Sequence, residues 1–500
     1  MCSSPLTSSI HILDDDSLLN VFYFYRPFLL GEDDEYEGFR LFGGTKGWYH
    51  GRWWYKLAHV CRRWRNIVIG SAAYLDVSLV CTTGTPVADM LANSPPLPLV
   101  IDYGEYENYY LTTEDEEGAI LALKQYDRVR RVRLFMPPTS LQKFIPTMDE
   151  EYPILEHLII YHSGADRITI LTFPETLQAP HLLHLVLFGF ALPIGSRLLT
   201  TAVGLVTLFF VMANPSTYFH PNTLLQWLSF MPQLETILIT FILPVCSRQV
   251  GGQPTHTAIT TPPVTLPNLH RFGFKGVTAY LEALLYRISA PRLERLQIEF
   301  FNQLTFSTPR LLHFVGATEN LRFKIAKLRF YDEVVYVGVY PHEEAEIYAP
   351  LFTFKCCHLD WQVSSAAQIC NPLSPMFSAV EHLTLEHSEH KRSSEEHNEV
   401  DRTEWRKLLS SFRNVKTLRI ATGLVEELSR CLQLDNGELP LELLPELQEL
   451  TYSGTGDTSN AFTPLIDARQ NAGRPLTPVK TGSGLDRAGP NLSEICPFPD

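Results

Sequence analysis

Histidine and cysteine side chains, two of the usual zinc ligands, gather at two places in the sequence. The first holds His382, His387, His390 and His397, and the second is the run 356–358 (Cys-Cys-His). The histidines lack the helical pair, four residues apart with a glutamate, that metalloproteases use to hold zinc. Adjacent side chains on a strand point to opposite faces, so the second run cannot easily ligate one ion. We expect a charged loop and buried thiols here, with no metal and no cofactor.

Acidic runs could supply a general acid and base, and two occur, at 114–117 and 149–151. Both lie in polar surroundings, and solvated turns are the simpler interpretation. The sequence contains neither a Gly-x-x-x-x-Gly-Lys-Ser/Thr phosphate loop nor a Gly-x-Ser-x-Gly nucleophile motif. We therefore expect no catalytic residues and a protein that is not an enzyme.

The stretch His59–Val68 (HVCRRWRNIV) combines basic residues with a tryptophan, and Trp53-Trp54 precede it closely. Such a helix could bind nucleic acid, or it could dock its apolar stripe on a partner protein. The chain has a net charge of -14 and 19% charged residues. Nucleic-acid binding requires cations that neutralise phosphates. The overall charge therefore favours a protein partner and argues against nucleic acid.

The cysteines and the apolar runs indicate the compartment. Nine cysteines, an odd number without any Cys-x-x-Cys spacing, favour reduced thiols in the cytoplasm or nucleus. The N-terminus lacks the basic region of a secretory signal. The most apolar run, Leu198–Ala213, is shorter than the roughly 20 residues that a membrane helix needs. Its β-branched and aromatic residues predict a buried strand, so we expect no membrane partner.

The first 80 residues predict three short helices. After a disordered 1–11, the helix 14–25 follows an aspartate cap, and a polar, glycine-rich insertion occupies 31–52. A second helix carries apolar residues at helical spacing from Leu57 to Val68, and a short third helix is expected around 72–75.

An L-x-x-L-x-L pattern then recurs about 29 residues apart, often after Pro-x or Asn. Its clear copies start at Leu155, Leu182, Leu234, Leu269, Leu293, Val415 and Leu447, and its fainter copies at Val129, Leu205, Ile325, Leu351 and Val380. Amphipathic stretches between the copies have helical spacing, for example 222–230 and 278–288. Each unit cannot bury its apolar residues alone, and stacking creates a shared core.

These patterns predict an α/β protein: a small three-helix N-terminal motif followed by an irregular leucine-rich-repeat solenoid with parallel strands and outer helices. The expected boundaries are a helical motif at 12–80, a linker or N-terminal cap at 81–124, the solenoid at 125–457, a C-terminal cap at 458–480 and a disordered tail at 481–500. An ordinary α/β domain remains an alternative, because strands and helices alternate there too.

The N-terminal region resembles the F-box proteins of fungi. The resemblance lies in the strings 57–65 (LAHVCRRWR) and 75–87 (LDVSLVCTTGTPV), which are fairly specific together. It covers about 12–103 closely and the repeats loosely. It implies that the helices bind the S-phase-kinase-associated adaptor of a cullin-based ubiquitin ligase, while the repeats recruit a target. No cysteine–histidine ring for ubiquitin transfer occurs in the chain.

Carried over by position, the resemblance places eight residues in the adaptor interface. They are Leu13, Leu18, Leu19, Phe22, Val60, Cys61, Trp64 and Ile67. Trp64 would be the anchor. Asp14 stands where the family usually has proline after the leucine, and the 31–52 insertion separates helices that the family joins closely.

Residues beside the second and third apolar positions of each unit project onto the inner face of such a solenoid. Basic residues exceed acidic ones there. The basic ones are Arg131, Arg133, Arg271, Lys275, Arg295, Lys327, Arg329, Lys355 and Arg419, and the acidic ones are Glu299, Glu386 and Glu449. We expect these cations to contact an acidic or phosphorylated segment of the target, although chance can also produce such an excess.

Three functions follow from the sequence. The first is a non-catalytic substrate receptor of a Skp–cullin–F-box ubiquitin ligase. The second is a leucine-rich-repeat scaffold whose F-box is degenerate and which has no role in ubiquitination. The third is an enzyme built on a parallel β-helix, which would lack helices between its strands.

Overall fold

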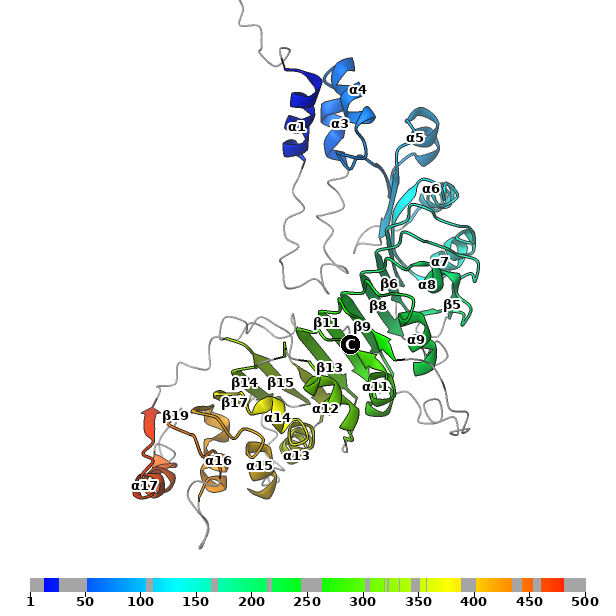
Figure 1. Cartoon of the computed structure of the whole chain (residues 1–500). Helices are drawn as coiled ribbons and strands as arrows, with labels where there is room; N and C mark the ends of the chain where they lie inside the picture. Colours follow the sequence, from blue (N-terminus) through cyan, green and yellow to red (C-terminus); the bar gives the residue numbers. More distant parts are fainter. Residues whose placement is uncertain are drawn as a thin grey trace, which may run out of the picture. The chain divides into compact units, whose positions relative to one another are not determined.

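Strands and helices alternate along the chain, in the arrangement that the apolar pattern predicts (Figure 1). The computed structural model describes residues 13–26, 52–104, 111–162, 170–212, 214, 218–243, 263–301, 306–318, 320–321, 323–331, 333–342, 351–356, 358–387, 402–433, 443–452 and 460–480. The expected disordered ends 1–11 and 481–500, the insertion apart from Arg52, and His390, His397 and Cys357 lie outside the described residues. The chain forms two units, Met1–Leu205 and Val206–Asp500.

Three helices begin the first unit: α1 (Asp15–Tyr25), α3 (Trp53–Ala58) and α4 (Arg62–Gly70). Asp14 caps α1, and its Oδ1 accepts a hydrogen bond from Ser17 N at 2.7 Å. The prediction of one long second helix is wrong, because the chain forms two helices there, α3 and α4. Cys61, between them, has extended backbone, and its Sγ caps α4. The expected third helix around 72–75 is a series of turns that ends at Asp76, where φ is 55°.

The sheet of the first unit has the strand order β1-β2-β3-β4-β6, and its strand pairs are parallel. These strands are β1 (Leu79–Thr82), β2 (Leu99–Gly104), β3 (Val129–Met136), β4 (His157–His162) and β6 (His184–Phe188). The helices α5 (Val87–Asn93), α6 (Thr113–Leu123) and α7 (Pro138–Phe144) lie between these strands in the sequence, and α8 (Arg197–Thr201) follows β6. The segment 81–124, predicted as a linker or N-terminal cap, contains the end of β1 and all of β2, which begin the sheet before residue 125.

The sheet of the second unit has the strand order β8-β9-β11-β13-β16-β15-β14-β17-β18-β19-β20. These strands are β8 (Thr207–Met212), β9 (Thr236–Phe241), β11 (Arg271–Gly276), β13 (Arg295–Phe300), β14 (Ile325–Phe330), β15 (Val334–Tyr340), β16 (Phe352–Lys355), β17 (His382–His387), β18 (Thr417–Ile420), β19 (Glu449–Tyr452) and β20 (Thr477–Lys480). Its helices include α9 (Pro221–Leu228), α11 (Thr278–Leu285), α12 (Pro309–Gly316), α13 (Leu359–Cys370), α14 (Ser374–Phe377), α15 (Arg402–Leu409), α16 (Val425–Cys431) and α17 (Thr463–Asn471). The helices predicted at 222–230 and 278–288 form as α9 and α11.

Each clear repeat copy has the same local structure. Its first apolar residue is buried, and its strand begins two residues later, as with Leu293 and β13. The next two apolar positions, Leu296 and Ile298 in that copy, point to the core because side chains alternate along a strand. The helices of each unit lie on the core face of its strands in Figure 1. We call the opposite face of each sheet its helix-free face.

The prediction that all the strands are parallel is wrong at one place. β15 runs antiparallel to both β14 and β16, and β16 rather than β14 lies beside β13. The faint copy that starts at Ile325 is misplaced in register by two residues. It predicts that Leu328 and Phe330 align with Leu383 and Leu385 of β17, but the residues that align with them are Ala326 and Leu328. The sequence of β15 has valine at every second position but contains no leucine, so the L-x-x-L-x-L pattern does not predict this strand.

The apolar run Leu198–Ala213 also differs from its prediction as one strand. Its first part lies in α8 and its second part in β8. No helix in the described part of the chain is both long enough and apolar enough to cross a membrane.

The expected C-terminal cap contains α17, which ends shortly before Gly473. The backbone of Gly473 is left-handed, with a φ of 77°. Buried Arg469 in α17 donates hydrogen bonds of 3.2 Å to the carbonyls of Leu444, Pro445 and Leu447. These bonds tie α17 to the segment that leads into β19.

Candidate functional site: two interaction surfaces

The eight residues predicted to bind the adaptor have different positions in the three N-terminal helices. Leu18 and Phe22 are buried, while Leu13 and Val60 are exposed. The remaining four, Leu19, Cys61, Trp64 and Ile67, are half-buried. The helices therefore use Leu18 and Phe22 for their own core, and the other six retain surface that a partner could contact.

Trp64 joins α1 to α4. Its ring lies 4.8 Å from that of Phe22 between centroids. Arg63 adds a polar connection, since its Nε and Nη2 donate to Asp15 Oδ1 at 2.7 Å and to the carbonyl of Leu13 at 2.6 Å. Arg63 thus also holds α1 and α4 together.

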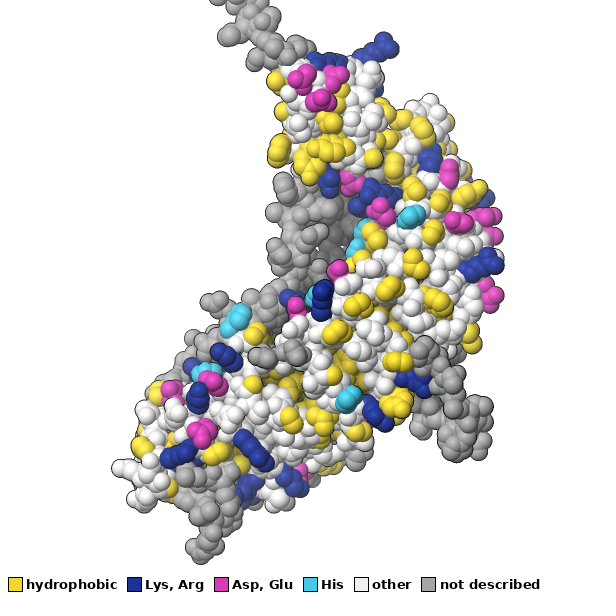
Figure 2. Space-filling view, viewed as in Figure 1, with side chains coloured by type: hydrophobic (Ala, Val, Ile, Leu, Met, Phe, Trp, Pro, Cys, Tyr) yellow, Lys and Arg dark blue, Asp and Glu magenta, His cyan; other side chains and the backbone are white. Residues whose placement is uncertain are grey.

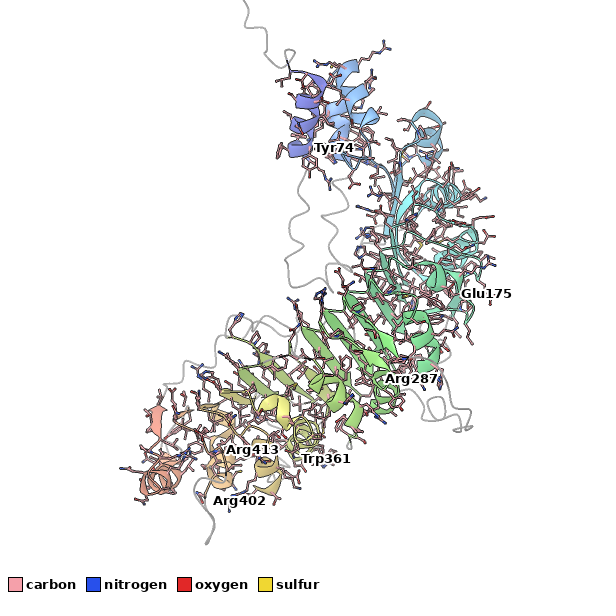
Figure 3. All side chains as sticks on the ribbon, viewed as in Figure 1. Tyr74, Glu175, Arg287, Trp361, Arg402 and Arg413 are labelled. Carbon is pink, nitrogen blue, oxygen red and sulfur yellow. The ribbon has the colours of Figure 1, made fainter. Side chains whose placement is uncertain are left out.

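The sequence prediction missed an exposed apolar area at one end of these helices. It consists of Val21, Tyr23, Phe24 and Tyr25 on α1 together with Tyr74, and Phe24 is 76% exposed. Figure 2 shows hydrophobic side chains gathered over one end of α1, and Figure 3 labels Tyr74 below the helices. The Tyr23 and Tyr74 rings are 5.1 Å apart. The sequence does carry a signal for this area. A helix that buries one side needs only one apolar stripe, whereas apolar residues occur on all sides of the helix over 18–25.

The nine basic residues predicted to bind a target all lie on the helix-free faces. The strand registers place them there, with Arg131 and Arg133 in the first unit and the other seven in the second. They are not equally available to a partner. Arg133 donates bonds of 2.7 and 2.8 Å to the carboxylate of Asp102, and both side chains are buried.

Lys275 is also engaged within its sheet, because its Nζ lies 3.0 Å from Glu299 Oε1 and both residues are buried. Separating either buried pair would leave a charge without its partner, which is costly. We therefore remove Arg133 and Lys275 from the candidate target surface. Arg295, Lys355 and Arg419 are exposed, and Arg271 is half-buried.

A cluster of charges lies beside the helix-free face of the first unit. Asp76 forms an ion pair with Arg130. The Nη2 atoms of Arg26 and Arg131 each lie 3.7 Å from Asp76 Oδ2. Burial lowers the pKa of Arg131, although the negative charge of Asp76 acts to raise it. Arg130 Nε also contacts Glu156 Oε2 at 2.8 Å.

Two histidines and an aromatic row share that face. The rings of His157 and His184 stack at 4.5 Å, and burial, His184 and Arg131 lower the pKa of His157 to about 2. Phe135, Tyr161 and Phe188 form a row with centroid separations of 4.6 and 4.1 Å. The sequence prediction missed these contacts, because they depend on which strands are neighbours.

Among the residues that the structure describes, those suspected of metal or acid–base chemistry are not brought together. Within the described ranges, no group of three or more His, Cys, Asp or Glu is placed to hold a metal. His382 and His387 lie five residues apart on β17 and point to opposite faces. The run 114–117 is the first turn of α6 rather than a solvated turn, since Thr112 and Asp115 form a capping box. Partial burial acts to raise the pKa of Asp115, but hydrogen bonds from Gly84 N and Thr112 lower it overall.

Known protein-family models do not match the chain, and a search of curated proteins finds no match either.

Proposed function

We propose that the chain is a substrate receptor of a Skp–cullin–F-box type ubiquitin ligase. In this proposal α1, α3 and α4 form an F-box-like motif that docks on the S-phase-kinase-associated adaptor and, through it, a cullin. The strand–helix repeats form a leucine-rich-repeat-like solenoid that holds a target protein.

The exposed apolar area on α1 carries the proposal. Contiguous exposed apolar side chains commonly mark a protein-binding surface, and here they lie on helices whose sequence resembles the F-box. Aromatic side chains such as Phe24 and Tyr25 are enriched at the centres of interfaces. The capping bond of Asp14 supports the start of α1 without the proline that the family usually has.

The experiment is a pull-down of purified adaptor by the full chain and two variants. Phe24→Asp places a charge in the exposed apolar area, and we expect it to abolish adaptor binding. Ile194→Asp is the matched control, because Ile194 is also 76% exposed but lies outside the helices. Equal binding by wild type and Phe24→Asp would overturn the assigned interface.

The alternative is a leucine-rich-repeat scaffold with a degenerate F-box and no role in ubiquitination. The two departures from the family pattern, Asp14 and the insertion at 31–52, favour this alternative. The same pull-down separates the two functions, since the scaffold would leave wild-type chain without adaptor under conditions in which a known F-box protein binds it.

A further inference from the structure

A group of charged side chains borders the exposed apolar area on α1. Arg26 directly follows Tyr25, and Asp76 lies two residues after Tyr74, so both charges continue that area along the chain. Arg26 Nη2 and Asp76 Oδ2 are 3.7 Å apart. Figure 2 shows basic and acidic side chains gathered below the hydrophobic ones at this end of the helices. A partner that covers the apolar area therefore meets charged groups at its border.

A β-bulge in β3 adds two arginines to this group. The register between β2 and β3 shifts by one residue between Leu99 and Val100, which makes Arg130 an extra residue in β3. A bulge re-aims side chains, and the side chains of Arg130 and Arg131 both reach Asp76. We call the following five residues the arginine cluster: Arg26, Asp76, Arg130, Arg131 and Glu156.

Arg130 engages both carboxylates of the arginine cluster. It forms an ion pair with Asp76, and its Nε lies 2.8 Å from Glu156 Oε2. Burial acts to lower the pKa of Arg130, but its bonds to Glu156 and Asp76 raise that pKa overall. Arg130 therefore bridges the two carboxylates and serves the structure of the cluster itself.

Arg26 and Arg131 keep hydrogen-bond donors for a partner. Their Nη2 atoms each lie 3.7 Å from Asp76 Oδ2, beyond the roughly 2.7–3.2 Å of an N–H···O hydrogen bond. Among the residues that the structure describes, neither side chain donates a hydrogen bond. The two side chains are 33% and 25% exposed. The three guanidinium groups and two carboxylates of the cluster leave one positive charge unbalanced.

One carboxylate matches what these two arginines offer. Both Nη2 atoms lie 3.7 Å from the same oxygen, so no more than twice that distance separates them. A carboxylate has two oxygens, and each can accept a charge-assisted hydrogen bond of about 2.8 Å from one guanidinium. Its single negative charge also balances the positive charge that the cluster has left over. A phosphate group carries nearly two negative charges and would make the cluster negative.

We propose that Arg26 and Arg131 bind a carboxylate of the adaptor at the border of the exposed apolar area. The inference rests on the proposed function and adds the chemistry of the partner surface, which is an apolar contact region bordered by an Asp or Glu side chain. Protein interfaces combine an apolar centre with a polar rim in this way. A charge pair at the rim fixes the register of the two proteins and speeds their association.

The test measures binding of purified adaptor to the full chain by biolayer interferometry. The double variant Arg26→Gln/Arg131→Gln removes both charges, and we expect it to bind about tenfold more weakly. Rising salt should weaken wild-type binding more than binding by the variant, because salt screens the charge pair. Arg292→Gln/Arg413→Gln is the matched control, since it removes two exposed arginines from the second unit and should bind like wild type (Figure 3).

A second measurement identifies the carboxylate on the adaptor. Each exposed Asp or Glu of the adaptor is changed in turn to Asn or Gln and is measured against wild type and Arg26→Gln/Arg131→Gln. One adaptor variant should weaken binding to wild type but not weaken it further in the double variant, which is the coupling that a direct contact produces. The single variant Arg26→Gln repeats the measurement at the end of α1, outside the strands, in case the double variant unfolds.

Three results would overturn the inference: wild-type binding by both arginine variants, equal loss in the control, or no coupling to any adaptor carboxylate. Phe24→Asp keeps the two proposals apart. Loss of binding in Phe24→Asp with none in the arginine variants rejects the carboxylate contact alone. A wild-type chain that does not bind adaptor rejects the proposed function and, with it, the adaptor as the ligand. Dimerisation of wild type that Phe24→Asp abolishes would assign the area to a second copy of the chain.

Discussion

The indole Nε1 of Trp54 donates a hydrogen bond of 3.0 Å to the carbonyl oxygen of Ser78, the residue before β1. Trp54 is buried, and Arg52 Nη2 donates a parallel bond of 3.0 Å to Thr85 Oγ1. Within the first unit, α3 is therefore joined directly to the first strand of the sheet.

Trp54→Phe tests this junction. The variant keeps most of the ring packing but removes the only donor of the indole, which leaves a buried carbonyl unsatisfied at a cost of about 1–3 kcal/mol. Urea unfolding followed by circular dichroism should show the loss. Trp361→Phe is the control, since Trp361 is 47% exposed and its replacement should change stability little.

Trp64→Ala should lose adaptor binding, because truncating an interface anchor costs roughly 2–4 kcal/mol. The contact with Phe22 adds a second effect, since α1 and α4 also lose packing. The Trp64→Ala variant should therefore bind adaptor at least about 30-fold more weakly, while the unfolding transition of the sheets remains. Binding equal to that of wild type would show that α4 is not the docking helix. Tyr126→Ala, at an exposed tyrosine outside the helices, is the control.

In the clear repeat copies, the apolar spacing predicted the strand starts and the face of each side chain, because alternation along a strand follows from covalent geometry. It could not predict which strands would be neighbours, and that decides the contacts. Arg133 meets Asp102, and Lys275 meets Glu299, only once parallel strands are aligned. Sequence spacing can therefore place a basic residue on a face of the sheet, but it cannot reveal which acidic residue that basic residue pairs with.

The break between α3 and α4 shows another limit. Leu57, Cys61, Trp64 and Val68 are spaced for one continuous helix. Cys61 nevertheless adopts φ of -161° and ψ of 170°, and its Sγ accepts a hydrogen bond from Trp64 N. Helical spacing continues across such a break, so periodicity cannot detect it.

Leu296→Asp should unfold several strands together. Leu296 is 6% exposed and aligns with Phe272 of β11 on the core face. An unpaired carboxylate there would be far more costly than a lost apolar contact. We expect loss of the cooperative unfolding transition, whereas Arg295→Asp, one residue earlier and exposed, should retain it. A soluble Leu296→Asp protein with a wild-type transition would contradict the strand register.

Stability should fall below about pH 6.5 because of His157. The pKa of His157 in the folded state is lowered to about 2, so the folded protein keeps the ring neutral, while the unfolded chain, with the ordinary pKa of 6.5, takes up a proton. The unfolded state thus binds more protons as pH falls, and folding loses about 2 kcal/mol between pH 6.5 and pH 5. Urea midpoints measured across this range should decline in wild type and decline less in His157→Leu. Identical slopes would show that the pKa of His157 does not differ between the folded and unfolded states.

The antiparallel strand β15 changes the order in which the second sheet can be assembled during synthesis. β13 ends at Phe300, but its neighbour β16 begins only at Phe352, after β14 and β15 have been made. A nascent chain that leaves the ribosome from its N-terminus can add β8, β9, β11 and β13 one at a time, and then must stop. β14 and β15 can pair with each other as a hairpin in the meantime, but they join the growing sheet only when β16 arrives to bridge them to β13.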